Sequence, residues 1–244
     1  MKSKNIIQIH KGYSALSLYD KVSLERWRLL HPSYNHKLFT NEEADEHVYK
    51  IIQDKRDLYD ALPFGAKFDI RRGAVVYALG GLYSDTDMYP VVSLEETLDQ
   101  ESEDGLFVFS SREQKMFMAG FFAAEQGHPL MKEFVLQSIQ RFYERPQPKE
   151  EDEISWAGWL LYATVHLWDD LFKSTGRKLE DGIAGVDCHG HDLDDRIKTG
   201  EVPLAIHYST ALWRPENKDK TGQDFYDAQN GMLSRIQELY GHLL

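Results

Sequence analysis

The sequence predicts an α/β fold, a single α/β/α sandwich built on a mostly parallel central sheet. Short β-rich segments alternate with longer segments of helical periodicity, which is the pattern of such sheets. The chain has 244 residues, a length that one domain can occupy. Apolar residues make up 42% of it, enough to form a sizeable core, so disorder is not expected. We therefore expect one domain over residues 1–244.

The first elements follow from turn and cap signals. Pro32 ends a stretch of helical spacing, since proline cannot continue a helix. Thr40 stands three residues before Glu43, which is a capping box and predicts a helix start. In order, we expect a strand over 5–10, a helix over 16–30, a strand over 34–39 and a helix over 40–54.

The later elements are predicted in the same way. Gly80-Gly81 is a helix stop, because glycine tolerates the left-handed conformation found there. In order, we expect a helix over 66–79, strands over 82–84 and 106–110, a strand or helix over 116–124, a helix over 128–143, a loop over 145–153, a helix over 156–172, a mostly irregular stretch over 183–199, a strand over 204–207 and an amphipathic helix over 225–243.

The charge balance excludes some classes of partner. Lys and Arg number 28 against 40 Asp and Glu, a net charge of −12. A duplex DNA binder or a protein held to anionic membrane by charge would need a basic face. We therefore expect no nucleic-acid partner. A phosphate ligand stays open, because a metal ion inverts the charge of an acidic pocket.

Cysteine usage and hydropathy bear on location. Cys188 is the only cysteine, which rules out an intramolecular disulfide and a Cys-rich zinc site. No run approaches 18 apolar residues, so we expect no transmembrane segment, and residues 1–10 are too short and polar for a signal peptide. These features together predict a cytoplasmic protein.

Asp85-Thr86-Asp87 directly follows an expected strand. In open α/β sheets, ligands bind beyond the carboxyl ends of the strands. Two carboxylates at this spacing are hard oxygen ligands suited to Mg²⁺ or Mn²⁺, and such an ion can bridge the phosphates of a nucleotide. In an acidic chain an isolated Asp-x-Asp is more often a solvated turn, so the motif alone leaves both interpretations open.

Asp69 and Arg72 lie in the helix before this strand, three residues apart and so on one helical face. One interpretation is a surface ion pair worth about 0.3–0.5 kcal/mol. The other is a carboxylate and a guanidinium that hydrogen-bond sugar hydroxyls.

The stretch from Asp69 to Asp87 resembles the signature of the DXD sugar-transferase family. That family includes yeast-type initiating mannosyltransferases, bacterial capsular polysaccharide transferases and, more distantly, the large clostridial glucosylating toxins. Its pattern is an Asp, an Arg three residues later, a Gly-Gly, an aromatic and an Asp-x-Asp. This chain matches it with Asp69, Arg72, Gly80-Gly81, Tyr83 and Asp85-Thr86-Asp87.

Weaker resemblance extends to both ends of the chain. His10 ends a segment similar to the family's opening strand and stands where a Trp packs on the nucleotide base. His31 stands at the Asn of a Trp…Asn-Pro-x-Tyr segment that begins here at Trp27. Residues 127–130 resemble a Gly-His-Pro-Phe helix start, and residues 207–213 resemble a closing His-x5-Trp motif.

The resemblance implies a fold of the GT-A type and a role for each matched residue. It implies that Asp87 binds Mn²⁺ or Mg²⁺, with Asp85 and His207 as further ligands, and that Asp85 also contacts the donor. The donor would be a nucleotide-diphosphate sugar, its sugar held by Asp69, Arg72 and Tyr83, its base by His10 and its pyrophosphate by Trp213. The implied catalytic residues are Asp85, Asp87, Asp69 and Arg72.

The function that these features predict is a metal-dependent retaining hexosyltransferase acting on a glycan or saccharide acceptor in surface polysaccharide or glycan synthesis. Residues 5–110 would form its nucleotide-sugar part and residues 111–244 its acceptor side. Two alternatives stay open: a nucleotide-sugar-binding protein of the same fold with weak catalysis, and a metal-dependent phosphohydrolase. Trp156, Trp159 and Trp168 are either core residues or a stacking surface for acceptor sugar.

Overall fold

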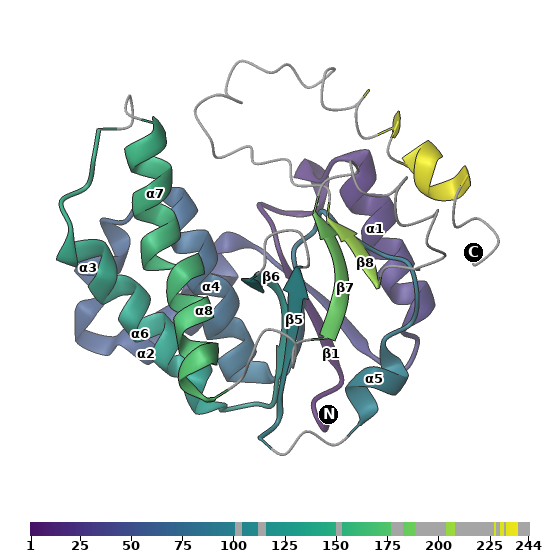
Figure 1. The fold of residues 1–244 in the computed structure, drawn as a ribbon, viewed down its shortest axis with the longest axis horizontal. Helices are drawn as coiled ribbons and strands as arrows, with labels where there is room; N and C mark the ends of the chain where they lie inside the picture. The colour runs from purple at the N-terminus through teal and green to yellow at the C-terminus, as the bar shows by residue number, and fades with distance from the viewer. Residues whose placement is uncertain are drawn as a thin grey trace.

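The structure of the chain is a computed structural model (Figure 1). It describes residues 1–100, 104–111, 116–149, 153–176, 183–188, 204–207, 227, 230–231 and 233–238. Side chains are described over the same ranges, except at 111, 116, 153–154 and 183–188.

Helices and strands alternate along the chain, as the sequence predicts. The first half contains β1 (Asn5–Ile9), α1 (Leu18–Leu30), β2 (Asn35–Phe39), α2 (Asn41–Ile52), α3 (Arg56–Asp60), α4 (Phe64–Leu79), β3 (Gly81–Ser84), β4 (Met88–Pro90) and α5 (Glu95–Asp99). The second half contains β5 (Leu106–Ser111), β6 (Met116–Ala124), α6 (Pro129–Glu144), α7 (Glu153–Ala163), α8 (Val165–Ser174), β7 (Ile183–Cys188) and β8 (Ala205–His207).

The described strands form one sheet in the order β2-β1-β3-β6-β5-β7-β8-β4. The pairs β1–β2, β1–β3, β5–β7 and β7–β8 are parallel. The pairs β3–β6, β5–β6 and β4–β8 are antiparallel. The expected mostly parallel sheet is confirmed, and its antiparallel strands are β6 near the centre and β4 at the edge.

Alternation along the strands divides the core between the two faces of this sheet. Leu82 and Phe121 face a cluster that includes Trp27 of α1. Tyr83 and Phe122 face the opposite cluster, where residues of α4, α6 and α8 pack. Figure 1 shows α2, α4, α6, α7 and α8 on one side of the sheet and α1 on the other, so the three layers of the predicted sandwich are present.

Local signals account for several element boundaries. The Thr40 hydroxyl accepts from the backbone N–H of Glu43, whose carboxylate accepts from Thr40, so the predicted capping box is confirmed. Gly80 ends α4 with φ +63°, a conformation that side chains disfavour. At Gly81 a Cβ would lie 2.8 Å from the Cβ of Asn5, so β1 and β3 could not approach as they do.

Two predictions need correction, and one strand was not predicted. The single helix expected over 156–172 is two helices, because Thr164 between α7 and α8 leaves the helical conformation at φ −123° and ψ −68°. Residues 183–188, expected to be irregular, form β7, which is held by pairing with β5 and β8 rather than by its own pattern. The sequence also gave no sign of β4, a three-residue edge strand where Pro90 is tolerated.

Other expectations are settled more simply. Trp156, Trp159 and Trp168 are buried core residues, at most 6% exposed, so none offers a stacking surface to an acceptor. Residues 227, 230–231 and 233–238 are helical, within the expected closing helix, whose remaining residues lie outside the described part. In that described part, no helix combines the length and apolar character needed to cross a membrane.

His31 is buried beside α1 and is held in its neutral form by two hydrogen bonds. Its Nε2 accepts from the backbone N–H of Leu94 at 2.8 Å, so the proton sits on Nδ1, which donates to the Trp27 carbonyl at 3.0 Å. Burial lowers the pKa of His31 below its ordinary value. The unfolded chain therefore takes up a proton first as the pH falls.

Neutral His31 stabilises the folded chain at neutral pH. We expect the free energy of unfolding to fall as the pH drops below about 6.5, by up to about 1.4 kcal/mol per pH unit, because the unfolded chain binds the proton first. His31→Asn supplies one donor and one acceptor without titrating, and should flatten that dependence. Urea unfolding of both proteins between pH 7.5 and 5 measures it, and equal slopes would contradict it.

Candidate functional site

Asp85 is placed at the carboxyl edge of the sheet by β3. Its backbone N–H donates to the carbonyl of Gly120 in β6 at 3.0 Å, and its carbonyl accepts from Met88 N–H at 3.1 Å. The second bond closes a turn over residues 85–88, so the Asp-x-Asp motif occupies a tight turn between β3 and β4. Its position beyond the end of a parallel strand is the one the sequence predicts.

Pairing of β4 with β8 brings His207 to this turn. Met88 is opposite His207 in the antiparallel register. Trp27 holds β4 from the other side, because its indole N–H donates to the Met88 carbonyl at 2.9 Å. His207 therefore lies beside Asp87, although it comes 120 positions later in the chain. The two side chains approach to 3.3 Å, between His207 Nε2 and Asp87 Oδ1.

Asp85, Asp87 and His207 form a cluster, here called the Asp-His cluster. One ligand atom from each residue lies within 4.8 Å of the others, and all three residues are partly buried. Two carboxylate oxygens and one imidazole nitrogen suit a divalent ion such as Mn²⁺, which accepts oxygen and nitrogen ligands. The donor set and its spacing therefore fit the metal that the resemblance implies.

Asp69 and Arg72 of α4 form an ion pair that points into the same site. Arg72 Nη2 lies 2.9 Å from Asp69 Oδ1 and 3.4 Å from Asp85 Oδ1. The exposed fractions of the side chains are 8% for Arg72, 19% for Asp69 and 14% for Asp85. This excludes the surface ion pair considered from the sequence, and α4 instead supplies a buried cation to the site.

Burial and the neighbouring carboxylates fix the charge states of Arg72 and Tyr83. Burial alone would lower the pKa of the Arg72 guanidinium, but Asp85 and Asp69 outweigh it and raise that pKa above its ordinary value. Burial and the charge of Asp85 raise the pKa of the Tyr83 hydroxyl well above its ordinary value. Arg72 therefore stays a cation and Tyr83 a neutral donor.

Asp85 itself is held from two sides. The Tyr83 hydroxyl donates to its Oδ1 at 2.7 Å, and Arg72 approaches the same oxygen. Burial raises the pKa of the Asp85 carboxyl, and the charge of Arg72 opposes that rise. Tyr83 is fully buried and supports the site through its hydrogen bond to Asp85, while its contact with a donor sugar stays a prediction.

Gly120 in β6 is a site residue that sequence reasoning missed. A Cβ there would lie 3.1 Å from the carboxyl carbon of Asp85 and inside van der Waals contact with its Oδ2. The absence of a side chain therefore makes the room that Asp85 occupies. The available signal was a glycine inside an otherwise apolar strand, which often marks the close approach of another group.

The remaining predicted site residues are His10 and Trp213. His10 follows β1, and its Nδ1 lies 3.2 Å from the Gly12 carbonyl. Because β1 and β3 are parallel neighbours, His10 is at the same edge of the sheet as Asp85. Trp213 lies outside the described residues, so its role stays a prediction. The division of the chain into a nucleotide-sugar part over 5–110 and an acceptor side over 111–244 also stays a prediction.

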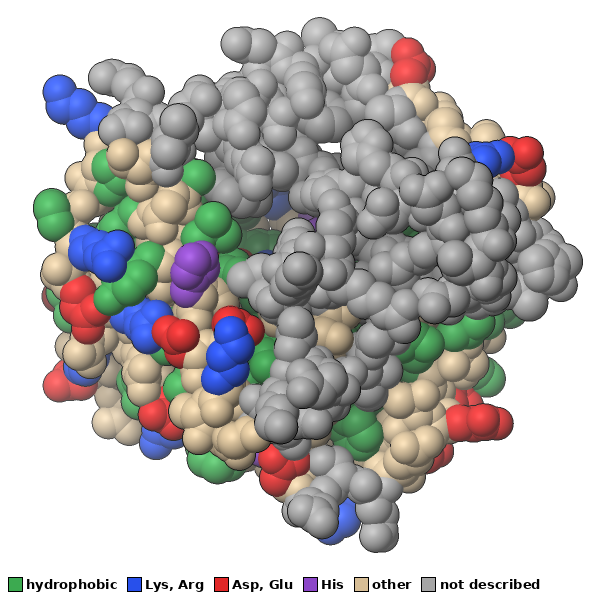
Figure 2. Space-filling view, in the orientation of Figure 1, with side chains coloured by type: hydrophobic (Ala, Val, Ile, Leu, Met, Phe, Trp, Pro, Cys, Tyr) green, Lys and Arg blue, Asp and Glu red, His purple; other side chains and the backbone are tan. Residues whose placement is uncertain are grey.

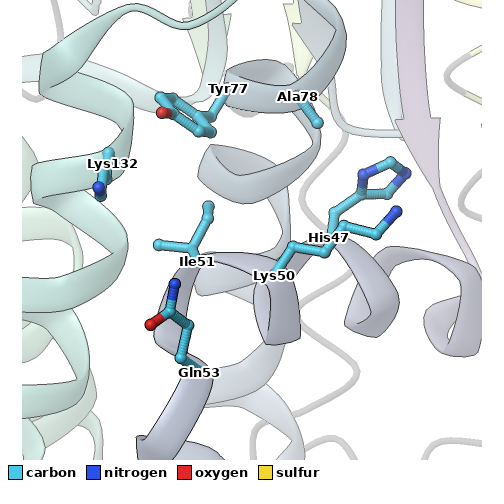
Figure 3. Close-up of a pocket in the computed structure, with 7 residues that line it drawn as sticks. All are labelled: His47, Lys50, Ile51, Gln53, Tyr77, Ala78 and Lys132. Atoms are coloured by element: carbon cyan, nitrogen blue, oxygen red, sulfur yellow. The ribbon is translucent and has the colours of Figure 1, made fainter.

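A cavity of about 200 Å³ lies away from this site, between α2, α4 and α6 (Figure 3). Figure 3 shows His47 and Lys50 on one side of it and Lys132 on the other. Its lining residues are His47, Lys50, Ile51, Gln53, Tyr77, Ala78 and Lys132. None of them belongs to the Asp-His cluster or the Asp69–Arg72 pair.

The described surface carries charges of both signs. Figure 2 shows Lys and Arg side chains interspersed with Asp and Glu side chains on the described part of the face in view. The chain has 40 acidic and 28 basic residues. On the described part of this face, the basic side chains form no continuous stripe of the kind that nucleic-acid binding requires.

Residues 17–104 match the family described as a glycosyltransferase sugar-binding region containing a DXD motif. This segment is similar in sequence to that family. It includes Asp69, Arg72 and the Asp85-Thr86-Asp87 turn, so the resemblance stated from the sequence is confirmed.

Two curated relatives carry related names. The chain is 22% identical over 148 residues to the putative glycosyltransferase HOC1 of Saccharomyces cerevisiae, covering 53% of this chain and 37% of that protein. It is 26% identical over 164 residues to an initiation-specific alpha-1,6-mannosyltransferase of Schizosaccharomyces pombe, covering 54% of this chain and 40% of that protein. The chain thus spans about two fifths of the length of these relatives.

A solved structure shares the fold. The PaToxG glycosyltransferase superposes with a TM-score of 0.51 at 14% sequence identity, covering 71% of this chain and 69% of that one. At this identity the likeness shows the fold alone. The chain therefore has the fold of a glycosyltransferase, in agreement with the GT-A type that the sequence resemblance implied.

Proposed function

We propose that the chain is a metal-dependent retaining glycosyltransferase that moves a hexose from a nucleotide-diphosphate sugar to a glycan or saccharide acceptor, in surface polysaccharide or glycan synthesis. The observation that carries this proposal is the convergence of the Asp-His cluster with the buried Asp69–Arg72 pair at one edge of the sheet. A cytoplasmic location is part of the proposal and is supported by the single cysteine.

Asp85, Asp87 and His207 are the residues that would hold Mn²⁺ or Mg²⁺. A divalent ion bound there supplies positive charge to the departing diphosphate. The net charge of −12 does not oppose such a ligand, because the acidic side chains at this turn bind the cation and the cation offsets the phosphates.

The chain's own residues position the donor sugar. Asp69 accepts from sugar hydroxyls and Arg72 donates to them, while their mutual ion pair at 2.9 Å keeps both side chains in one orientation. Tyr83 and Arg72 orient Asp85 from within the core. His10 stacks on the base, and Trp213 covers the pyrophosphate.

Retention follows from attack on the same face that the diphosphate leaves. The bond from the anomeric carbon to the diphosphate oxygen breaks, the acceptor hydroxyl oxygen forms the new bond at that carbon, and the hydroxyl proton passes to the departing diphosphate. No residue of the site is assigned as a covalent nucleophile. Catalysis then rests on the positions of the reacting groups and on the charges of Arg72 and the Asp-His cluster.

A thermal-shift panel of nucleotide-diphosphate sugars tests the proposal. The donor should raise the melting temperature in the presence of Mn²⁺ and not in its absence, by an amount that corresponds to about 2.7 kcal/mol at a hundred times the dissociation constant. Mn²⁺-dependent donor consumption should accompany the shift.

The same panel, run beside an assay of phosphate release from simple phosphoesters, separates the alternatives. A donor-dependent shift without donor consumption indicates a nucleotide-sugar-binding protein that does not transfer. Phosphate release from simple phosphoesters, with no response to any nucleotide sugar, indicates a phosphohydrolase. Either result contradicts the proposed transferase.

A further inference from the structure

Thr164 lies at the break between α7 and α8 and contacts the proposed site. Its hydroxyl oxygen is 2.6 Å from Asp69 Oδ2 and 3.0 Å from the Leu160 carbonyl oxygen. Thr164 is fully buried. It is 95 residues from Asp69 in sequence, so neither helix periodicity nor the DXD signature relates the two.

The hydroxyl has a single proton, and Asp69 is the acceptor that geometry and charge favour. The contact to Asp69 is the shorter of the two, and a carboxylate accepts a stronger hydrogen bond than a backbone carbonyl. The Leu160 carbonyl already accepts one hydrogen bond, from the backbone N–H of Thr164 at 3.1 Å. The proton therefore points to Asp69.

This contact gives the second oxygen of the Asp69 carboxylate a partner. Oδ1 pairs with Arg72 at 2.9 Å and Oδ2 accepts from Thr164. With one partner on each oxygen, the carboxylate plane cannot turn without breaking a bond. Arg72 in turn reaches Asp85, so polar contacts run from the α7–α8 break to the Asp-x-Asp turn.

We propose that Thr164 is a positioning residue for Asp69 in the transferase reaction; this rests on the proposed function of the site. Thr164 touches neither the Asp-His cluster nor Arg72 in the described contacts, and it acts by fixing the carboxylate that orients Arg72 and faces the donor sugar. The helices of the second half of the chain thereby take part in holding a donor-side residue of the first half.

A purely structural role, stabilising the helix break, accounts less well for the contacts. The backbone of Thr164 keeps helical partners on both sides: its N–H donates to Leu160, and its carbonyl accepts from Trp168 N–H at 2.8 Å. The hydroxyl is therefore not needed to satisfy the backbone at the break. Its short contact to a carboxylate outside both helices is left to be explained, and positioning of Asp69 explains it.

Three variants separate these roles. Thr164→Val keeps the branched shape and removes the hydroxyl, whereas Thr164→Ser keeps the hydroxyl and removes a methyl group. Ser138→Ala is the matched control, because Ser138 in α6 is also fully buried and its hydroxyl has no hydrogen-bond partner among the described residues. Donor consumption and transfer are measured with saturating Mn²⁺, well below the melting temperature of the least stable variant.

We expect Thr164→Val to lower kcat about tenfold or more, with KM for the donor within about twofold, because a mispositioned group costs more in the transition state than in binding. Thr164→Ser and Ser138→Ala should stay within about threefold of the wild type. A purely structural role would instead lower the melting temperature of Thr164→Val and Ser138→Ala alike and leave kcat unchanged.

Two results would overturn the inference while leaving the proposed function intact. One is a wild type that transfers sugar together with a Thr164→Val variant of equal kcat. The other is a Thr164→Ser variant as slow as Thr164→Val, which would assign the effect to side-chain packing at this position rather than to the hydroxyl. A wild type that shows neither Mn²⁺-dependent donor binding nor turnover would instead overturn the proposed function itself.

Discussion

Asp87→Asn is expected to abolish sugar transfer while the fold survives. Asp87 contributes an oxygen to the Asp-His cluster and lies 3.3 Å from His207 Nε2. The amide keeps the shape of the side chain and removes the negative charge that a divalent cation requires. Because the side chain is partly exposed, the change leaves no large buried cavity, and the melting temperature should change little.

The measurement is transfer with saturating Mn²⁺, together with the thermal unfolding of both proteins. Asp54→Asn is the matched control, since Asp54 is an exposed carboxylate outside the site and should keep wild-type activity. Normal turnover of Asp87→Asn under these conditions would contradict the assignment of the Asp-x-Asp turn as the metal site.

Gly120→Ala is expected to have the second largest effect, on activity and on stability together. The added methyl group would overlap the Asp85 carboxylate, whose carboxyl carbon lies 3.1 Å from the position of that Cβ. Asp85 must then rotate away from Tyr83 and Arg72, which hold it now. We expect activity to fall about a hundredfold, since a displacement of about 1 Å in a reacting site has that cost.

Overpacking of this strand should also lower the free energy of unfolding by about 1–3 kcal/mol. Gly158→Ala in α7 is the matched control, because a Cβ there meets no atom within 4 Å. That variant should be fully active and as stable as the wild type or slightly more so, since alanine favours a helix. A Gly120→Ala protein with wild-type activity would show that Asp85 needs no such space.

Local chemistry accounts for most of what could be predicted about the fold. The capping box at Thr40 and the glycine stop at Gly80 depend on residues within one turn of each other, and both are present as predicted. The Asp69–Arg72 pair also follows from helix periodicity alone. By contrast, no Pro or Gly stands at the break at Thr164, so no local signal of this kind marks it.

Long-range pairing decided what could not be predicted locally. β7 contains Gly185 and has no alternating pattern, so its strand conformation depends on hydrogen bonds to β5 and β8. β4 is three residues long, too short to recognise without its partner β8. His207 was expected near the metal only because a similar motif exists elsewhere, and the β4–β8 register is what brings it to Asp87.

The sequence by itself determined the class of fold, the residues of the Asp-x-Asp turn and the helical pair that accompanies them, because each depends on neighbours in the chain. Only the tertiary structure decided that Gly120 makes room for Asp85 and that Thr164 holds Asp69. Both contacts join residues tens of positions apart, and their effect depends on distances of about 3 Å that no periodicity encodes. The sequence alone predicted the acidic turn. The residues that orient the carboxylates of the site come from β6 and from the α7–α8 break, and only tertiary packing brings them there.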